Sequence, residues 1–386
     1  MTTKIGDPDV ASAYDQEHDP RELNGIPVRN LWLLMLYASS LYRELSRGQF
    51  RVEENPDDIP DLVAELLTRS VERRLRRNLS RAPVRRSDVL HRVRGRIDVL
   101  TTTRHQFLER GVVACRFEDS TINTPRNRYI RAALERLSTL VNRHDLSHRC
   151  RVLANSLREV GVIGEKPSRA EMSLDRVERN QSNDRAMLNA AHLAFDLALP
   201  TQWAGDRNLP SPSDNVHWLR MLYEKGIAGF YDAVLPDGWR VEAGKWFRWP
   251  IEGRTPGIDR ILPSMQTDII LTNQSMSTRI VIDTKFTSIV KSGQYRKETL
   301  SSGYVYQLYA YLRSQEGQGD PLANASSGLM LHPSTGEMID ETAVIQGHAI
   351  RFATVDLAAS ASKIRDQLIN IALQSLAEPT EPDRVT

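Results

Sequence analysis

The stretch TDIILTNQSMSTRIVIDTKF, residues 267–286, places charged groups inside two apolar segments and constrains the fold more than any other part of the chain. The two segments read as short strands joined by the polar turn TNQSMST. Asp268, Asp283 and Lys285 stand among their Ile, Val and Leu residues. Ionised side chains are costly to bury unless other groups compensate their charge, so something must pair with these three.

The alternation of side chains along a strand predicts that these charges meet at one place. Val281, Asp283 and Lys285 share one face of the second strand. Asp268 lies 15 positions before Asp283, so a hairpin with strands of five or six residues brings the two carboxylates side by side. A solvated ion pair between Asp283 and Lys285 on an edge strand is the alternative interpretation.

Two converging carboxylates form a hard oxygen site that suits Mg²⁺, which needs few protein ligands when a substrate phosphate supplies the others. The pattern therefore predicts metal-dependent phosphodiester hydrolysis, with Asp268 and Asp283 as the metal ligands. The metal would polarise the phosphoryl oxygen and activate a water. Lys285 would orient that water or stabilise the growing negative charge. Mg²⁺ is the expected cofactor, and Mn²⁺ is a substitute.

The chain has 386 residues, enough for two or three domains, and its 40% hydrophobic content is sufficient for a real core. Residues 23–199 are predicted to form a mainly helical N-terminal domain with a β-arm that includes residues 93–99. The prolines of residues 200–215 indicate a linker or long loop. Residues 216–376 alternate as α-β-β-β-α-β, which describes an α/β (α+β) domain with a mixed sheet flanked by helices.

The sequence argues against a membrane-spanning protein and against a metal site formed by its cysteines. Its longest apolar run, residues 31–41, is far shorter than the roughly 20 residues that span a bilayer, and we expect a cytoplasmic protein. Cys115 and Cys150 have no metal-ligand spacing and are expected to be reduced, partly buried thiols. Residues 1–22 and 377–386 read as flexible tails.

Arginines are concentrated in residues 69–96, where eleven of them stand against two acidic residues for a local formal charge of +9. One interpretation is contact with DNA phosphates or with the acidic surface of a partner. The other is a solvated helical face in an arginine-rich composition, because only 8 of the 51 basic residues are Lys. Both interpretations stay open.

Asp268 followed by Asp283-x-Lys285, on a helix-strand-strand-strand-helix-strand frame, resembles the PD-(D/E)xK nuclease superfamily. Thr267 stands where the superfamily usually has a proline. The resemblance implies a restriction-endonuclease-like core and an endodeoxyribonuclease activity.

Further positions match the same superfamily. Gln307 and Tyr311 in YQLYAY match its Q-x-x-x-Y motif, which implies that Gln307 lies near the catalytic cluster and the DNA and that Tyr311 supports it. Glu224 lies on the first helix of the domain, from which members often place a Glu that reaches the metal site. An exposed Glu224 paired with a neighbouring cation is the alternative.

Three segments before this core resemble landmarks of the McrC family, the nuclease subunit of the McrBC methylation-dependent (type IV) restriction system. They are IPVRNLWLLMLYA, VRGRIDV at residues 93–99 and CRFEDSTINTPRNRYIRAAL at residues 115–134, and the resemblance runs from about residue 25 to about residue 335. It implies docking on a hexameric AAA+ GTPase that resembles McrB, recognises double-stranded DNA carrying modified cytosine and is stimulated by the N-terminal region. Arg94 and Arg96, together with Tyr311, are the implied contacts to the partner or to DNA.

GTP would be bound by that partner, because this chain has no G-x-x-x-x-G-K-[ST] loop. Two other functions remain open. The chain could be an autonomous nuclease of restriction or repair that binds DNA through its own basic region. It could also be a degenerate nuclease kept as a scaffold that activates an NTPase, although intact Asp268, Asp283 and Lys285 argue against that function.

Overall fold

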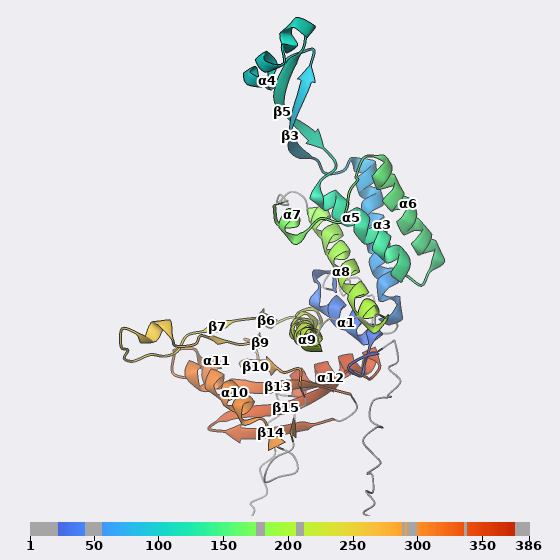
Figure 1. Cartoon of the computed structure of the whole chain (residues 1–386). Helices are drawn as coiled ribbons and strands as arrows, with labels where there is room; N and C mark the ends of the chain where they lie inside the picture. The colour runs from blue at the N-terminus through green and yellow to red at the C-terminus, as the bar shows by residue number, and fades with distance from the viewer. Residues whose placement is uncertain are drawn as a thin grey trace, which may run out of the picture. The chain divides into compact units, whose positions relative to one another are not determined.

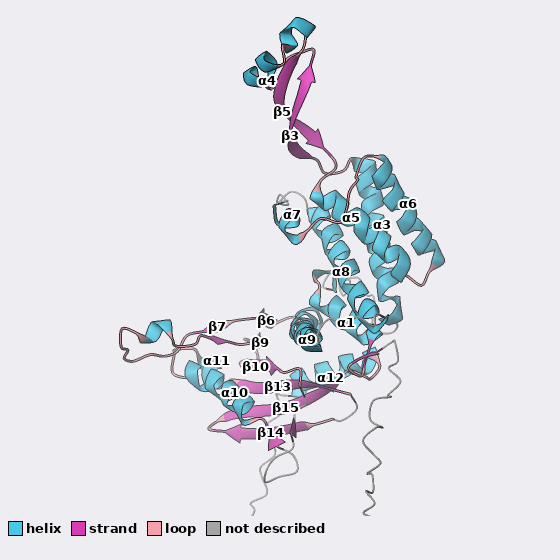
Figure 2. Ribbon diagram, in the orientation of Figure 1, coloured by secondary structure: helices cyan, strands magenta, loops and turns pink. Residues whose placement is uncertain are grey.

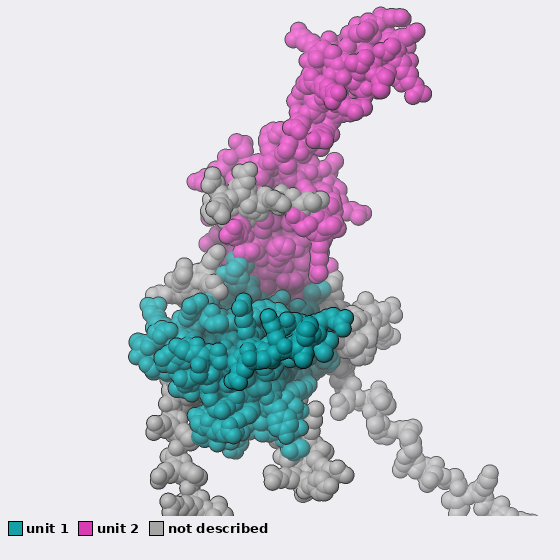
Figure 3. All heavy atoms as spheres, turned by 90° about the vertical axis from the view of Figure 1, so that its left-hand side faces the viewer, with its two compact units in different colours: residues 1–57, 199–386 teal, residues 58–198 magenta. Residues whose placement is uncertain are grey.

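The computed structural model describes residues 22–42, 56–174, 182–205, 212–287, 290–291, 299–335 and 338–374. Figure 3 shows its two compact units, which we call the sheet unit (residues 1–57 and 199–386) and the helical unit (residues 58–198). Within the described ranges, no helix is long and apolar enough to cross a membrane. Both cysteines are free and buried, as predicted.

A six-stranded mixed sheet forms the centre of the sheet unit (Figure 1). Its strand order is β14-β15-β13-β10-β9-β6, and the middle strand β10 is antiparallel to β9 and parallel to β13. The predicted mixed sheet is confirmed, and β14 is an additional strand whose mostly exposed residues lack an apolar alternation. The bounds are β6 Trp239–Ala243, β9 Ile269–Asn273, β10 Thr278–Thr284, β13 Ser327–Ser334, β14 Asp340–Ile345 and β15 His348–Asp356.

Helices cover both faces of this sheet. On one face, α10 (Ser302–Gln315) buries Leu308 and Leu312 in a core cluster with Val281 of β10 and with Ile350 and Phe352 of β15. On the other face, the intervening residue of β15, Arg351, donates through Nη1 to the Ile371 carbonyl of α12 (Ala361–Gln374) at 2.8 Å. Successive side chains of β15 thus point to opposite faces of the sheet, toward α10 on one face and α12 on the other.

The helix α9 (Pro212–Val234) lies on the α12 side, where the Tyr231 hydroxyl donates to the Leu368 carbonyl at 3.1 Å. Against it packs α1 (Val28–Ala38), and the rings of Tyr37 and Phe230 lie 5.0 Å apart. Asn30 of α1 donates to the Leu357 carbonyl at 2.7 Å, which ties this helix to the residue that follows β15.

The position of α1 differs from the predicted N-terminal domain of residues 23–199. Its nearly all-apolar surface is buried against α9, so it joins the sheet unit although it is distant from that unit in sequence. The expected linker, residues 200–215, is also partly helical, because α8 (Ser182–Gly205) continues through Pro200 and α9 begins at Pro212. Residues 206–211 lie outside the described ranges.

The helical unit combines packed helices with a β-arm, as predicted (Figure 2). The arm is a three-stranded antiparallel sheet, β3-β5-β4, with the short helix α4 at its far end. The bounds are α3 Ile59–Arg77, β3 Ala82–Leu90, β4 Arg96–Ile97, α4 Val99–Arg104, β5 Val113–Thr121, α5 Pro125–Leu140, α6 His144–Glu159 and α7 Arg169–Leu174.

Short elements complete the described residues of the two units. They are β1 Glu22–Leu23, β2 Ile26–Pro27, η2 Pro56–Asp58, η3 Phe107–Arg110, β7 Trp246–Phe247, η4 Ile258–Arg260, β8 Met265–Gln266, β11 Val290–Lys291, β12 Thr299–Leu300 and α11 Pro321–Asn324.

The close approach of α1 and α9 predicts the effect of a single methyl group. A Cβ at Gly229 would lie 1.9 Å from the Tyr37 carbonyl oxygen, so Gly229→Ala must push the two helices apart. We expect the free energy of unfolding, measured by urea denaturation, to fall by about 1–3 kcal/mol.

Gly303→Ala is the matched control, since this helical glycine is exposed and a Cβ there meets nothing within 4 Å. It should be neutral or stabilising by up to about 1 kcal/mol. Equal stability of the two variants would contradict the close packing.

Candidate active site

The ends of β9 and β10 bring two aspartates to opposing positions. Ile269 pairs with Ile282 in antiparallel register, so the next positions along the ladder are Asp268 and Asp283. Directly opposed residues of an antiparallel pair project to the same face of the sheet. The predicted hairpin geometry of the two aspartates is therefore present.

Asp268 is held against β10 by its own side chain. Its Oδ2 accepts hydrogen bonds from the Thr284 backbone N–H at 2.7 Å and from the Thr284 hydroxyl at 2.8 Å. Thr284 was not predicted as a site residue, and only its position beside Asp283 could have suggested it. The preceding residue, Thr267, is buried and its N–H donates to the Lys245 carbonyl at 3.0 Å. The usual proline would lack this donor.

Asp283 is the most deeply buried of the predicted carboxylates, with 1% of its surface exposed. Its Oδ2 lies 2.7 Å from the Lys285 ammonium, whereas Oδ1 has no hydrogen-bond donor among the described residues. Burial raises the pKa of Asp283 to about 6; Lys285 opposes this rise and Asp268 adds to it. The surroundings therefore leave part of its negative charge uncompensated.

A continuous chain of contacts links Lys285 to the start of the hairpin. The Lys285 ammonium, on a side chain that is almost fully buried, donates to Gln307 Oε1 at 3.1 Å. Gln307 Nε2 donates to the Tyr311 hydroxyl at 2.6 Å, and that hydroxyl donates to the Gln266 carbonyl at 2.8 Å. The Tyr304 ring, which the sequence did not single out, lies 5.1 Å from the ammonium. The Q-x-x-x-Y pair of α10 thus fixes the lysine from one side.

Glu224 approaches the same place from α9. It is half-buried, and its pKa is raised first by burial and then by the nearby charge of Asp268. One turn earlier, the exposed Arg220 lowers the pKa of both Glu224 and Asp283. Arg220 was not predicted, although its spacing of four residues from Glu224 places both on one helix face. Three carboxylates and two cations therefore share one electrostatic neighbourhood.

The residues present fit a small divalent cation. Among the described residues no group of three or more His, Cys, Asp and Glu side chains has the geometry of a complete metal cage. Asp268 and Asp283 nevertheless offer two carboxylates, and the buried Oδ1 of Asp283 has no donor in the described chain. Mg²⁺ at phosphoryl-transfer sites takes one or two carboxylates and obtains its other ligands from water and substrate.

Arg94 and Arg96 lie elsewhere, on the β-arm of the helical unit. Arg94 pairs with Asp119 at 3.0 Å and its guanidinium stacks 4.3 Å above the Phe117 ring, so both contacts stabilise the β-arm itself. Arg96, in β4, is exposed. Part of the charge of residues 69–96 is compensated locally, for example by the ion pairs of Arg86 and Arg94 with Asp119.

Comparison with known proteins supplies independent information. The family model described as "McrBC 5-methylcytosine restriction system component" matches residues 6–323. The type IV methyl-directed restriction enzyme EcoKMcrBC of Escherichia coli (strain K12) is 23% identical over 353 residues, which cover 90% of this chain and 97% of that protein.

Among solved structures, one chain of a half-complex from a tetradecameric assembly of Thermococcus gammatolerans McrB AAA+ hexamers with bound McrC is similar. Its TM-score is 0.41 at 13% identity, over 92% of this chain and 78% of that one. Since the family model spans well over half of the residues, the chain belongs to the family of McrBC 5-methylcytosine restriction system components.

Proposed function

We propose that this chain is a DNA endonuclease subunit that hydrolyses phosphodiester bonds with Mg²⁺ at Asp268, Asp283 and Lys285. The observation that carries the proposal is the buried Asp283 carboxylate, which opposes Asp268 and contacts a buried lysine. A charged group of this kind at a strand end is expensive unless it serves a ligand or a reaction. We assign the sheet unit to the PD-(D/E)xK nucleases on the same grounds.

The bound cation would supply the charge that polarises the scissile phosphoryl group and lowers the pKa of a water. Asp268 and Asp283 would hold it, with Glu224 as a further carboxylate beside them. Lys285 presents its ammonium to the negative charge that develops on the phosphate. Gln307 and Tyr311 hold that ammonium in position, because the chain of hydrogen bonds that runs through them ends on the Gln266 backbone carbonyl. Positioning of this kind removes reorganisation from the reaction step.

We further propose that the chain works with a hexameric AAA+ GTPase that resembles McrB, binds the GTP and recognises double-stranded DNA with modified cytosine. The family description and the similarity to EcoKMcrBC point to this partner. The β-arm offers a suitable surface, because large apolar side chains are exposed near its end, where soluble proteins seldom leave them without a partner. They are Val93, Val99, Leu100 and Leu108.

The variant Asp283→Ala separates cutting from assembly. We expect the cleavage rate of methylated duplex DNA, with Mg²⁺, GTP and the partner ring, to fall at least about 1000-fold, because a metal ligand and the partner of Lys285 are both lost. Binding to the ring and stimulation of its GTPase should be unchanged, since the β-arm lies in the other unit.

The same assay discriminates between the alternatives. Cutting by the purified wild-type chain without nucleotide or ring would favour an autonomous nuclease. A ring whose GTPase responds to the chain, without any metal-dependent cutting, would favour a scaffold. Undiminished cutting by Asp283→Ala would show that the site is assigned wrongly.

Tyr311→Phe tests the chain of hydrogen bonds behind Lys285. Loss of one hydroxyl releases both Gln307 and the Gln266 carbonyl, and we expect the cleavage rate to fall about 10- to 100-fold with little change in KM. Tyr306→Phe, which removes a hydroxyl from an exposed tyrosine of the same helix, is the matched control and should cut like wild type. Equal rates in the two variants would leave Tyr311 without a positioning role.

Leu100→Asp tests the end of the β-arm. Leu100 is 84% exposed, so the substitution should leave folding intact while it lowers GTPase stimulation and ring binding about 10-fold or more. Ile163→Asp changes an exposed apolar residue of the same unit outside the arm and should have no effect. A loss of stimulation in both variants, or in neither, would remove the support for this surface.

A further inference from the structure

A short hairpin is fixed directly to Asp268, the residue that precedes β9. Its strands β7 and β8 pair antiparallel, with Trp246 opposite Gln266 and Phe247 opposite Met265. At its base, the Gly244 N–H donates to the Asp268 carbonyl at 2.8 Å and the Thr267 N–H donates to the Lys245 carbonyl at 3.0 Å. Whatever binds the hairpin is therefore held at a fixed distance from the candidate active site.

The first strand of the hairpin and its continuation present aromatic and cationic side chains to solvent. In KWFRWP, residues 245–250, burial alternates: Phe247 and Trp249 pack against the core cluster, whereas Trp246 and Arg248 are exposed. Trp249 donates through Nε1 to the Pro263 carbonyl at 2.7 Å, which ties this segment to the return path of the hairpin. Trp246 is 62% exposed, an unusual position for the largest apolar side chain.

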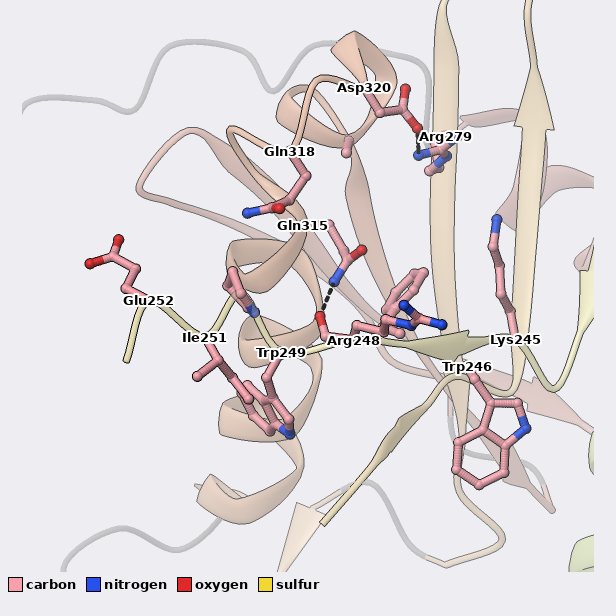
Figure 4. Close-up of a pocket in the computed structure, with 13 residues that line it drawn as sticks. Lys245, Trp246, Arg248, Trp249, Ile251, Glu252, Arg279, Gln315, Gln318 and Asp320 are labelled. Atoms are coloured by element: carbon pink, nitrogen blue, oxygen red, sulfur yellow. Dashed lines mark hydrogen bonds and ion pairs between the residues drawn. The ribbon is translucent and has the colours of Figure 1, made fainter. Parts of the chain in front are cut away.

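Trp246 and Arg248 border a cavity of about 740 Å³, within the usual size range of ligand pockets (Figure 4). Gln315 lines the same cavity and donates to the Arg248 carbonyl at 3.4 Å, while Arg279 is paired with Asp320 at 2.6 Å. Arg248 has no ion pair within the described ranges. The cavity therefore combines an exposed aromatic face, an available guanidinium and an amide.

The cavity lies within reach of a DNA strand that passes through the active site. Arg279 and Asp283 lie on the same face of β10, four residues apart, which corresponds to about 13 Å along a strand. Trp246 is opposite Gln266, two residues before Asp268, so a strand that leaves the scissile phosphate along the hairpin would meet Trp246 within a few nucleotides.

We propose that Trp246 and Arg248 form a subsite for the substrate strand beside the candidate active site, where Trp246 stacks on an unpaired base and Arg248 binds a phosphate. The inference rests on the proposed nuclease function. Alternation of aromatic and cationic side chains is typical of surfaces that bind single-stranded nucleic acid. Residues 245–262 also carry four cationic and two acidic side chains, which complements a polyanion.

The full-length chain in metal-free buffer is titrated into a fluorescein-labelled 30-nucleotide single strand and into the matching duplex, and anisotropy is recorded at several salt concentrations. We expect Trp246→Ala to weaken single-strand binding about 5- to 100-fold, as for the loss of one stacked base, and the duplex to be affected less. Trp246→Phe should restore most of the affinity. Arg248→Ala should weaken binding and lower the salt slope by about one.

Lys363→Ala, which removes an exposed charge from α12 on the other face of the sheet, is the matched control and should bind like wild type. Three results would overturn the subsite: no affinity of the wild-type chain for either DNA, equal affinity in Trp246→Ala, or a loss confined to the duplex. Weaker ring assembly in Trp246→Ala with unchanged DNA binding would also overturn it, in favour of a protein contact.

The two proposals fail separately in these experiments. If Trp246→Ala binds DNA normally while Asp283→Ala abolishes cutting, only the subsite is wrong. If Trp246→Ala weakens DNA binding but no metal-dependent cutting is found in any condition, only the nuclease assignment is wrong.

Discussion

One buried carboxylate, that of Asp283 at the end of the central strand β10, constrains the rest of the site. Burial raises its pKa from 3.8 to about 6, so this residue contributes stability at low pH that is lost as the pH rises through about 6. Above that pH the folded chain holds an ionised carboxylate that its own residues compensate only in part. A bound cation would supply the missing compensation, which is why the position is better suited to function than to stability.

The surrounding structure is arranged around that carboxylate. The register of β9 and β10 sets Asp268 opposite it, and Thr284 holds the Asp268 carboxylate in place. From one helical layer, Gln307 fixes the lysine that pairs with Asp283; from the other, Glu224 adds a carboxylate whose raised pKa reports the same crowding of negative charge. The site therefore depends on both faces of the sheet, although its principal residues occupy one hairpin.

The Q-x-x-x-Y pair was identified through the resemblance to the PD-(D/E)xK nucleases, whereas local pattern predicted the hairpin, because a strand period of two places its charged side chains on one face. The helical unit with a β-arm and the mixed sheet were also predicted from local pattern. The position of α1 was not predicted, because it depends on Gly229 of α9, which lets the Tyr37 backbone approach closely. These two residues are almost 200 positions apart in the sequence. Arg220, Tyr304 and the exposed Trp246 were also missed, since only folding determines which of many similar side chains faces the site.

Binding of Mn²⁺, followed by the loss of the free-ion signal in electron paramagnetic resonance, tests whether Asp268 and Asp283 hold a metal ion. The wild-type chain should bind Mn²⁺ at about pH 7.5 and at least about tenfold more weakly at about pH 5, where Asp283 is protonated, and Asp268→Asn and Asp283→Asn should bind equally weakly. Asp320→Asn, whose carboxylate pairs with Arg279 in the same unit, should bind like wild type. Wild-type affinity in Asp283→Asn, or an affinity that does not change between the two pH values, would contradict the assignment of this carboxylate as a metal ligand.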